Sequence, residues 1–443
     1  MRRLLVIIIG AIPLMSLPVM AAGYAVKEFS AEAMATAYAG AAAGGPNAGY
    51  LPYNPASAAG VSDLDMTANL VGILPGSSAD YPVALTSAGT PTGGSTAPRN
   101  FIRDALVPSF DLRYRLSPRL SAGLSVYAPW GLSTSYSANW AGRYYAESTK
   151  LLTANITPVI AYEVLPELVV GGGPQLEYAR GRMTSVIDTG TIGYGLGVPG
   201  AVPGTQDSYA ELTGASWAFG YVLGTIWHPD RSISIGLSYR SMLSHKLRGP
   251  LLFQTDGAGV GNALKVAAGL FLDTRQTTPL NMPPVVSLGV TYAMSDEWTF
   301  AVEFDWMEWS KFSQLTVTAA NPAQPPDQTL TRWKDSSFVS IGVEHSLSQN
   351  WQLRGGVAYD QSPVPDGTRE PRIPDADRFW ISAGVDYRLS NLTDIDLTVS
   401  HLFNRTSHVS LNPSMGGDAL RGYLSGTTRS YVDVVGLQLN YRV

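Results

Sequence analysis

The chain has 443 residues, of which 15% are charged, with 30 basic and 35 acidic residues and a formal net charge of −5. This balance argues against nucleic-acid binding, and the lack of cysteine excludes disulfides and thiolate metal sites. After residue 22 no apolar run is long enough to span a membrane as a helix, although 45% of all residues are hydrophobic. Such a composition fits strands with one apolar and one polar face.

The first 21 residues have the pattern of a secretory signal peptide. Two arginines precede an apolar segment that ends near Leu17, and the small residues Val19 and Ala21 occupy the positions that signal peptidase reads. A membrane anchor is the alternative, but Pro13 and the short apolar run disfavour it. We therefore predict cleavage after Ala21 and export from the cytoplasm.

Residues 22–63 differ in composition from the rest of the chain. They are rich in alanine and glycine, lack an alternating strand pattern, and contain a turn at Asn54, Pro55 and Ala56. A disordered periplasmic tail is one interpretation, since small residues bury little area. A compact plug, or hatch, inside a barrel is the other.

From residue 65 to residue 443 the chain reads as about fourteen short runs of alternating apolar and polar residues, separated by gaps that are in turn short and long. This rhythm predicts an all-β fold, a transmembrane antiparallel β-barrel with tight turns on one side and long loops on the other. So many long loops count against a soluble sandwich. A barrel of this size encloses a lumen too wide for side chains to fill. We therefore predict a hatch over residues 22–63 and a barrel over residues 64–443.

Alternation assigns the two faces of the predicted strands. Val286, Leu288, Val290 and Tyr292, for example, form one apolar face that we expect to meet lipid. Aromatic residues also gather beside the short turns, where we predict a periplasmic girdle. A general preference of aromatic residues for strands is the alternative explanation. The girdle candidates are Tyr114, Tyr162, Trp227, Tyr292, Trp298, Trp351, Tyr387 and Tyr441.

The third predicted strand is interrupted by Ala128, Pro129, Trp130 and Gly131. Proline cannot donate to the ladder and glycine has no side chain to pack, so a bulge or kink is expected here. In a closed barrel such a kink opens a gap in the wall. Alternatively, Pro129 lies in a loop beyond the end of the strand.

Catalysis finds little support in the sequence. None of the five histidines lies in a metal-ligand or nucleophile-elbow pattern. Asp375 and Asp377 lie in proline-rich sequence that is typical of turns rather than of a cation site. We expect no enzyme activity, no cofactor and no metal.

Several strings in the chain match one known family. They are AGY at 22–24, EFS at 28–30, AYAG at 37–40, NPA at 54–56, WSKF at 309–312, DQSPVP at 360–365 and IPDADRFW at 373–380. In these the chain resembles the FadL-type outer-membrane transporters of long-chain fatty acids and other hydrophobic compounds, over essentially the whole mature sequence. The resemblance implies a fourteen-stranded barrel with an N-terminal hatch in its lumen.

The resemblance also implies residue roles. Tyr24, with Phe29 nearby, would lie against a hydrophobic substrate pocket, and Arg180 would help to bind a substrate carboxylate. An ordinary lumen-facing charge is the alternative for Arg180. Thr316 stands where fatty-acid members have a second basic residue, which leaves room for neutral or aromatic hydrocarbons. The interruption at residues 128–131 would be a lateral opening through which substrate leaves into the membrane.

Together these observations predict passive uptake of a hydrophobic small molecule across the outer membrane of a Gram-negative bacterium. The expected partners are the substrate, outer-membrane lipid and lipopolysaccharide, without nucleic acid, and we expect a monomer. The alternatives are a neutral or aromatic hydrocarbon channel of the same family and a nonspecific porin, which would need the hatch to leave the lumen.

Overall fold

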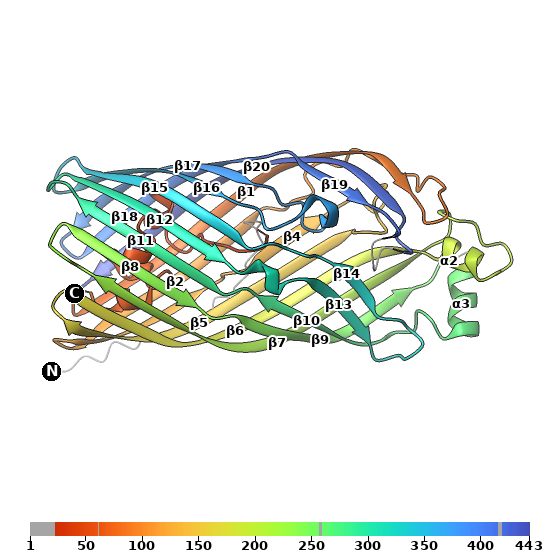
Figure 1. The fold of residues 1–443 in the computed structure, drawn as a ribbon, viewed down its shortest axis with the longest axis horizontal. Helices are drawn as coiled ribbons and strands as arrows, with labels where there is room; N and C mark the ends of the chain where they lie inside the picture. Colours follow the sequence, from red (N-terminus) through yellow and green to blue (C-terminus); the bar gives the residue numbers. More distant parts are fainter. Residues whose placement is uncertain (1–22, 61, 257–258, 415–418) are drawn as a thin grey trace.

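The computed structural model describes residues 23–60, 62–256, 259–414 and 419–443. The predicted signal peptide lies outside the described residues. The described chain forms a barrel with short helical segments inside one end and beyond the other (Figure 1). Within these residues no helix is long and apolar enough to cross a membrane.

The wall is one antiparallel sheet of twenty strand segments. They are β1 Leu64–Leu85, β2 Ala105–Ser117, β3 Leu120–Tyr127, β4 Gly131–Ser135, β5 Ser148–Leu165, β6 Leu168–Asp188, β7 Asp207–Trp227, β8 Ile233–Arg240, β9 Leu243–Gln254, β10 Thr274–Met282, β11 Val285–Ala293, β12 Trp298–Met307, β13 Gln314–Ala319, β14 Asp327–Leu330, β15 Ser336–Ser346, β16 Trp351–Asp360, β17 Arg378–Ser390, β18 Thr393–Asn404, β19 Ser407–Leu411 and β20 Tyr423–Arg442.

Six pairs of consecutive segments each continue one wall strand, namely β3 with β4, β8 with β9, β10 with β11, β12 with β13, β14 with β15, and β18 with β19. Twenty segments therefore make fourteen wall strands. The sheet closes because β1 pairs with β20, from Asp65 opposite Arg442 to Leu85 opposite Tyr423. The predicted all-β barrel of about fourteen strands is confirmed.

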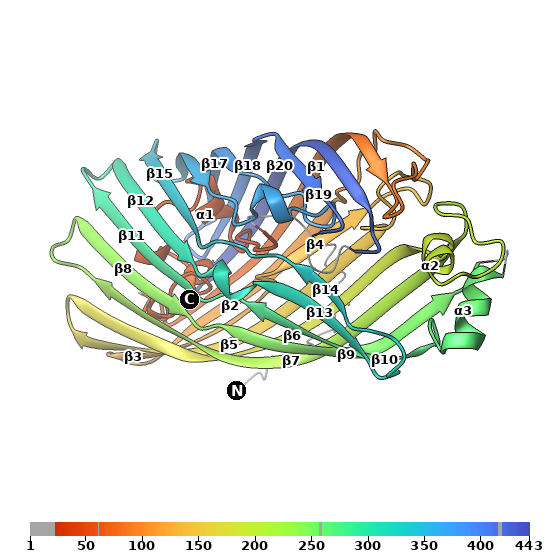
Figure 2. The same cartoon turned by 45° about the vertical axis from the view of Figure 1, so that its right-hand side comes forward.

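The two ends of the barrel differ as predicted. Tight turns join strands at the end that holds the C-terminus, whereas long connections gather at the opposite end (Figures 1 and 2). Two helices lie in these long connections, α2 Thr189–Gly195 and α3 Val260–Ala268. Short 3-10 turns also occur, η4 Trp309–Lys311 and η5 Asp366–Thr368.

The faces of the wall follow the predicted alternation. On β12, Val302, Phe304 and Trp306 are exposed, whereas the intervening Glu303 and Asp305 are buried toward the lumen. An exposed apolar face of this extent is stable only against lipid. Of the eight predicted girdle aromatics, seven are exposed on this face near the tight turns, and Tyr387 is half-buried.

Residues 23–60 lie inside the lumen near the tight-turn end, drawn in red in Figure 1. They form α1 Ala31–Ala35 and the 3-10 turns η1 Ala41–Ala43, η2 Ala48–Tyr50 and η3 Pro55–Ala58. Ser30, Asn47 and Asn54 each cap one of these segments with a side-chain oxygen. We call residues 23–60 the hatch.

Polar contacts fix the hatch to the wall. Asn54 Nδ2 donates to Ala42 O at 2.6 Å and to Thr225 O of β7 at 3.0 Å. Inward-facing wall glycines let the hatch backbone approach, because an added Cβ would collide with it. These glycines include Gly171, Gly236, Gly289, Gly342 and Gly356. The hatch is thus packed against the wall, unlike a disordered tail.

A buried ion cluster adds a second anchor. Arg354 of β16 binds Glu32 of α1 at 2.8 Å and Asp396 of β18 at 3.0 Å, and all three side chains are almost fully buried. Such a cluster is costly to disrupt, since removal of one member leaves an uncompensated charge.

Candidate functional site

Tyr24, near the start of the hatch, is buried in a cluster of aromatic rings. Its ring centroid lies 4.7 Å from that of Trp309, 5.6 Å from Trp333, 5.7 Å from Phe312 and 6.0 Å from Trp130. We call these four surrounding side chains the aromatic cage. Since the cage is apolar and tightly packed, any hydrophobic ligand that uses it has to displace the Tyr24 ring.

Hydrogen bonds hold the N-terminal residues in this position. The Tyr24 hydroxyl donates to Asn281 O at 3.1 Å, and burial raises the pKa of Tyr24 well above its ordinary value, so the donor proton is retained. The Gly23 backbone N donates to the Asp375 carboxylate at 2.9 Å, and Arg378 donates to the same carboxyl group at 2.8 Å. Asp375 is therefore a docking point for the hatch.

The third wall strand is interrupted beside the cage. β3 ends at Tyr127 and β4 begins at Gly131, and both pair with β5, at Asn155 and Leu152 respectively. Three residues on this strand therefore lie opposite two on β5, which is a β-bulge. The interruption that the sequence predicts is present in the wall.

The hatch pairs with this interruption like a short strand. Val26 N donates to Pro129 O at 2.8 Å, and Gly131 N donates to Tyr24 O at 2.9 Å. These bonds flank an antiparallel bridge between Ala25 and Trp130. The hatch thus satisfies the Pro129 carbonyl and the Gly131 amide, whereas the Thr153 hydroxyl of β5 satisfies the Trp130 amide and carbonyl.

The neighbouring strand β2 also lacks ladder pairs with the third wall strand at this level. Its ladder with β3 extends only to Phe110 opposite Val126, and within the described chain residues 105–109 have ladder pairs with β1 alone. The Ser109 hydroxyl instead donates to Phe29 O of the hatch at 2.6 Å. The hatch therefore covers a break in the wall from the inside.

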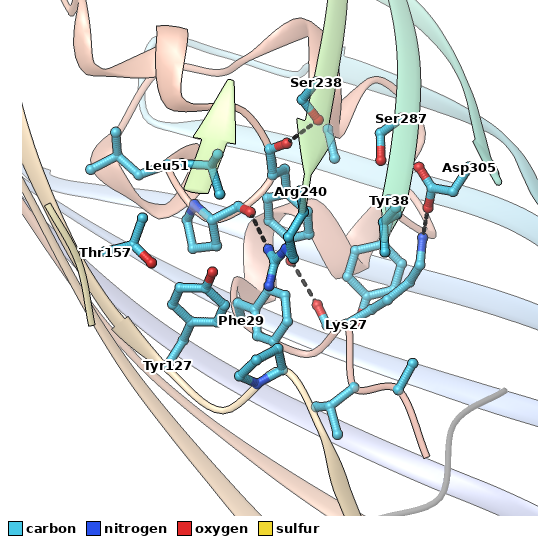
Figure 3. Close-up of a pocket in the computed structure, with 18 of the residues that line it drawn as sticks. Lys27, Phe29, Tyr38, Leu51, Tyr127, Thr157, Ser238, Arg240, Ser287 and Asp305 are labelled. Carbon is cyan, nitrogen blue, oxygen red and sulfur yellow. Dashed lines mark hydrogen bonds and ion pairs between the residues drawn. The ribbon is translucent and has the colours of Figure 1, made fainter. Parts of the chain in front are cut away.

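An inner cavity lies between the hatch and this part of the wall (Figure 3). Its free volume is about 70 Å³, small against the usual range of about 300–1,000 Å³ for small-molecule sites, so a ligand of that size enters only when the hatch moves. Phe29 and Tyr53 of the hatch line it together with Tyr127 and Pro129 of the wall. Phe29 thus lies at the inner cavity and not in the cage.

Two cations border the inner cavity. Lys27 pairs with Asp305 and lies 3.6 Å from the centroid of Phe338. Arg240 donates to the Pro52 carbonyl at 2.8 Å and has no acidic partner among the described residues. Arg240 is therefore the cation that remains available to a ligand carboxylate (Figure 3).

An outer cavity of about 350 Å³ lies among the long connections. Apolar side chains of β6, β7, β9 and β13 line it, including Leu212, Leu251 and Phe253. Arg372 borders the cavity and donates to Thr184 O at 3.2 Å, and its burial lowers its pKa to about 10. The cavity combines an apolar floor with a cation, which suits an amphipathic ligand.

Arg180 lies elsewhere. It is exposed on β6, where the buried Ala179 faces the lumen and the exposed Arg180 points outward. This position does not support contact with a carboxylate inside the lumen. Thr316 lies on β13 opposite Gln328, outside the cage.

No role was predicted from the sequence for Arg240 or for the cage residues Trp309, Phe312 and Trp333. Trp309 and Phe312 belong to a string that carries the family resemblance, so a signal for them was present. Trp333 and Arg240 stand in no motif, and only the fold brings them to Tyr24 and Phe29 respectively.

Comparisons with known proteins agree with this geometry. A profile described as "Outer membrane protein transport protein (OMPP1/FadL/TodX)" matches residues 12–443. The long-chain fatty acid transport protein of Escherichia coli (strain K12) is 26% identical over 439 residues, covering 95% of this chain and 96% of that protein.

Solved structures share the fold. A Pseudomonas aeruginosa FadL homologue superposes with a TM-score of 0.86 at 23% identity, covering 95% of this chain and 100% of the other. The Pseudomonas putida toluene transporter TodX superposes with a TM-score of 0.68 at 14% identity, covering 93% and 97%. The chain belongs to the OMPP1/FadL/TodX family of outer membrane transport proteins.

Proposed function

We propose that this protein takes up long-chain fatty acids or similar hydrophobic molecules with one carboxylate, and releases them sideways through the wall at residues 128–131. The observation that carries the proposal is the pairing of residues 24–26 with the interrupted strand. Because the same segment fills the aromatic cage and covers the wall break, one movement of it uncovers both.

The proposed route runs from the outer cavity through the cage to the inner cavity and the wall break. Transfer of apolar surface out of water is favourable by about 25 cal/mol per Å². The apolar part of the substrate therefore has a lower free energy in each cavity than in water. A hydrophobic solute gains nothing by entering the watery periplasm, whereas a break that faces lipid lets it partition directly into the bilayer. The packed hatch argues against a nonspecific porin.

Two observations bear on the substrate class. Arg240 in the inner cavity and Arg372 in the outer cavity are suited to a carboxylate, and the Escherichia coli relative is named a long-chain fatty acid transport protein. The cage of aromatic rings, which contains no charged side chain, favours a second candidate, a neutral or aromatic hydrocarbon. The relatives named toluene transporters share the fold at 14–18% identity.

A reversible crosslink tests the proposed movement. The natural chain has no cysteine, so the double variant Ala25→Cys/Trp130→Cys contains a single possible disulfide. These residues form a non-hydrogen-bonded antiparallel pair, whose Cα atoms lie about 4.5 Å apart. That separation is within the range of about 4.4–6.8 Å that a disulfide requires.

We expect no fatty-acid uptake into vesicles that contain the oxidised variant, and restored uptake after the disulfide is reduced. Each preparation therefore serves as its own control. Equal uptake in the oxidised and reduced states would refute release past residues 128–131.

A further inference from the structure

A group of basic side chains lies on the outer surface of the barrel wall, away from both cavities. Its members are Lys150 on β5, Arg180 on β6, Lys246 and Arg248 on β9, and Arg275 on β10. We call them the outer-wall basic patch. We propose that this patch binds the phosphates of lipopolysaccharide in the outer leaflet.

The strand register brings these residues together. Arg180 lies opposite Ala215 of β7, and Ala215 lies opposite Arg248 of β9. Neighbouring strands are about 4.8 Å apart, so Arg180 and Arg248 stand about 10 Å from each other on the same face. All patch members except the half-buried Lys150 are exposed.

The patch borders the outer edge of the lipid-facing band. On β7 the exposed apolar side chains extend from Trp227 beside the tight turn to Trp217, ten residues away. At about 3.3 Å per residue and a tilt of about 40°, this stretch spans roughly 25 Å, the height of the apolar band of an outer-membrane barrel.

An aromatic pair marks that edge. Tyr178 and Trp217 lie opposite each other with ring centroids 5.1 Å apart, as expected for side chains at headgroup level. Arg180 follows Tyr178 by two residues toward the loops, on the same face of β6. The patch therefore lies at the level of the outer-leaflet headgroups.

The patch charges lack partners among the residues that the structure describes. Arg182, which also lies on this face, forms two hydrogen bonds of 2.9 Å with Glu211. By contrast, none of the five patch side chains has an ion pair or hydrogen bond in the described part of the chain. In a chain of net charge −5, this outward cluster of unpaired cations is the complement of an anionic headgroup.

Lipopolysaccharide is the occupant that this position favours. It fills the outer leaflet of the outer membrane, and the lipid A part carries phosphates at the boundary between its sugars and its acyl chains. Arginine binds phosphate through charge-assisted hydrogen bonds, and the apolar band directly below the patch would receive the acyl chains.

The test uses full-length protein in detergent and two ligands, lipid A with both phosphates and dephosphorylated lipid A, with binding followed by native mass spectrometry. The patch variant is Arg180→Gln/Arg248→Gln. The matched control is Arg119→Gln/Arg231→Gln, which removes two exposed arginines from the tight-turn end. Heat-modifiable migration on gels checks that both variants are folded.

We expect phosphorylated lipid A to bind more tightly than the dephosphorylated form, and the patch variant to lose about tenfold or more of that affinity. The control should retain it, and added salt should weaken wild-type binding. Equal affinity for both lipids, or the same loss in both variants, would overturn the proposal.

Discussion

At the scale of single residues, the side on which a strand residue points decides what it can bind. Side chains on a strand alternate between faces, so a displacement of one residue moves a charge from the lumen to the outer surface. The family resemblance placed Arg180 in the substrate path, but the strand directs it outward. Arg240, at the end of β8, reaches the inner cavity, where the other cation, Lys27, is paired with Asp305.

The first prediction is that Arg240, and not Arg180, binds the substrate carboxylate. Arg240→Gln should weaken binding of a long-chain fatty acid by about 1.5–3 kcal/mol, because a charge-assisted hydrogen bond is lost, and should leave the corresponding neutral alcohol almost unaffected. Isothermal titration of both ligands measures this difference. Arg180→Gln is the matched control and should bind both ligands as the wild type does. A selective loss of fatty acid in the Arg180 variant, and not in the Arg240 variant, would reverse the assignment.

At the scale of elements, the hatch is a separate piece of chain that the wall does not need for closure. The β1–β20 ladder closes the barrel, while hatch contacts are confined to the lumen and the wall break. The alanine- and glycine-rich composition indicated a plug because small residues allow close packing. It did not indicate which wall residues would anchor the plug, since Glu32, Arg354 and Asp396 lie far apart in sequence.

The second prediction is that deletion of residues 23–62 leaves a folded barrel that conducts ions. The reason is that the hatch fills a lumen whose wall is complete without it, apart from the break at residues 128–131. Single-channel conductance in planar bilayers measures the effect, and heat-modifiable migration verifies folding. A folded deletion variant with unchanged low conductance would show that the hatch is not what blocks the lumen.

The third prediction concerns the anchor. Arg354→Met leaves Glu32 and Asp396 buried without their cation and should lower the free energy of unfolding by about 3–5 kcal/mol. Arg388→Met is a suitable control, because Arg388 is half-exposed and lies 3.6 Å from Asp394. Asp394 is buried but keeps Arg442 as a second partner, so loss of the half-exposed Arg388 should cost only about 0–1 kcal/mol. Urea titration in detergent compares the two, and similar losses would mean that the cluster does not anchor the hatch.

At the scale of the whole molecule, the sequence predicted the barrel well and the site only in part. Alternation and turn spacing are local signals, so the strands, their faces and the interruption at residues 128–131 were readable. The cage joins Tyr24 to Trp130, Trp309 and Trp333, which come from segments up to about 300 residues apart, and no local pattern reports such contacts.

The fourth prediction concerns our proposal that substrate leaves through the wall where the third strand is interrupted. Replacement of the three residues Ala128, Pro129 and Trp130 by the two residues Val-Thr removes the extra residue of the bulge and lets the strand pair continuously with β5 and β2. Trp130→Thr alone is the control for loss of the cage ring. The decisive measurement is the rate of labelled fatty-acid uptake into cells that contain each variant at equal amounts. We expect uptake to be abolished in the continuous-strand variant and retained in the Trp130→Thr control. Uptake at the control rate in the continuous-strand variant would show that substrate does not leave at this break.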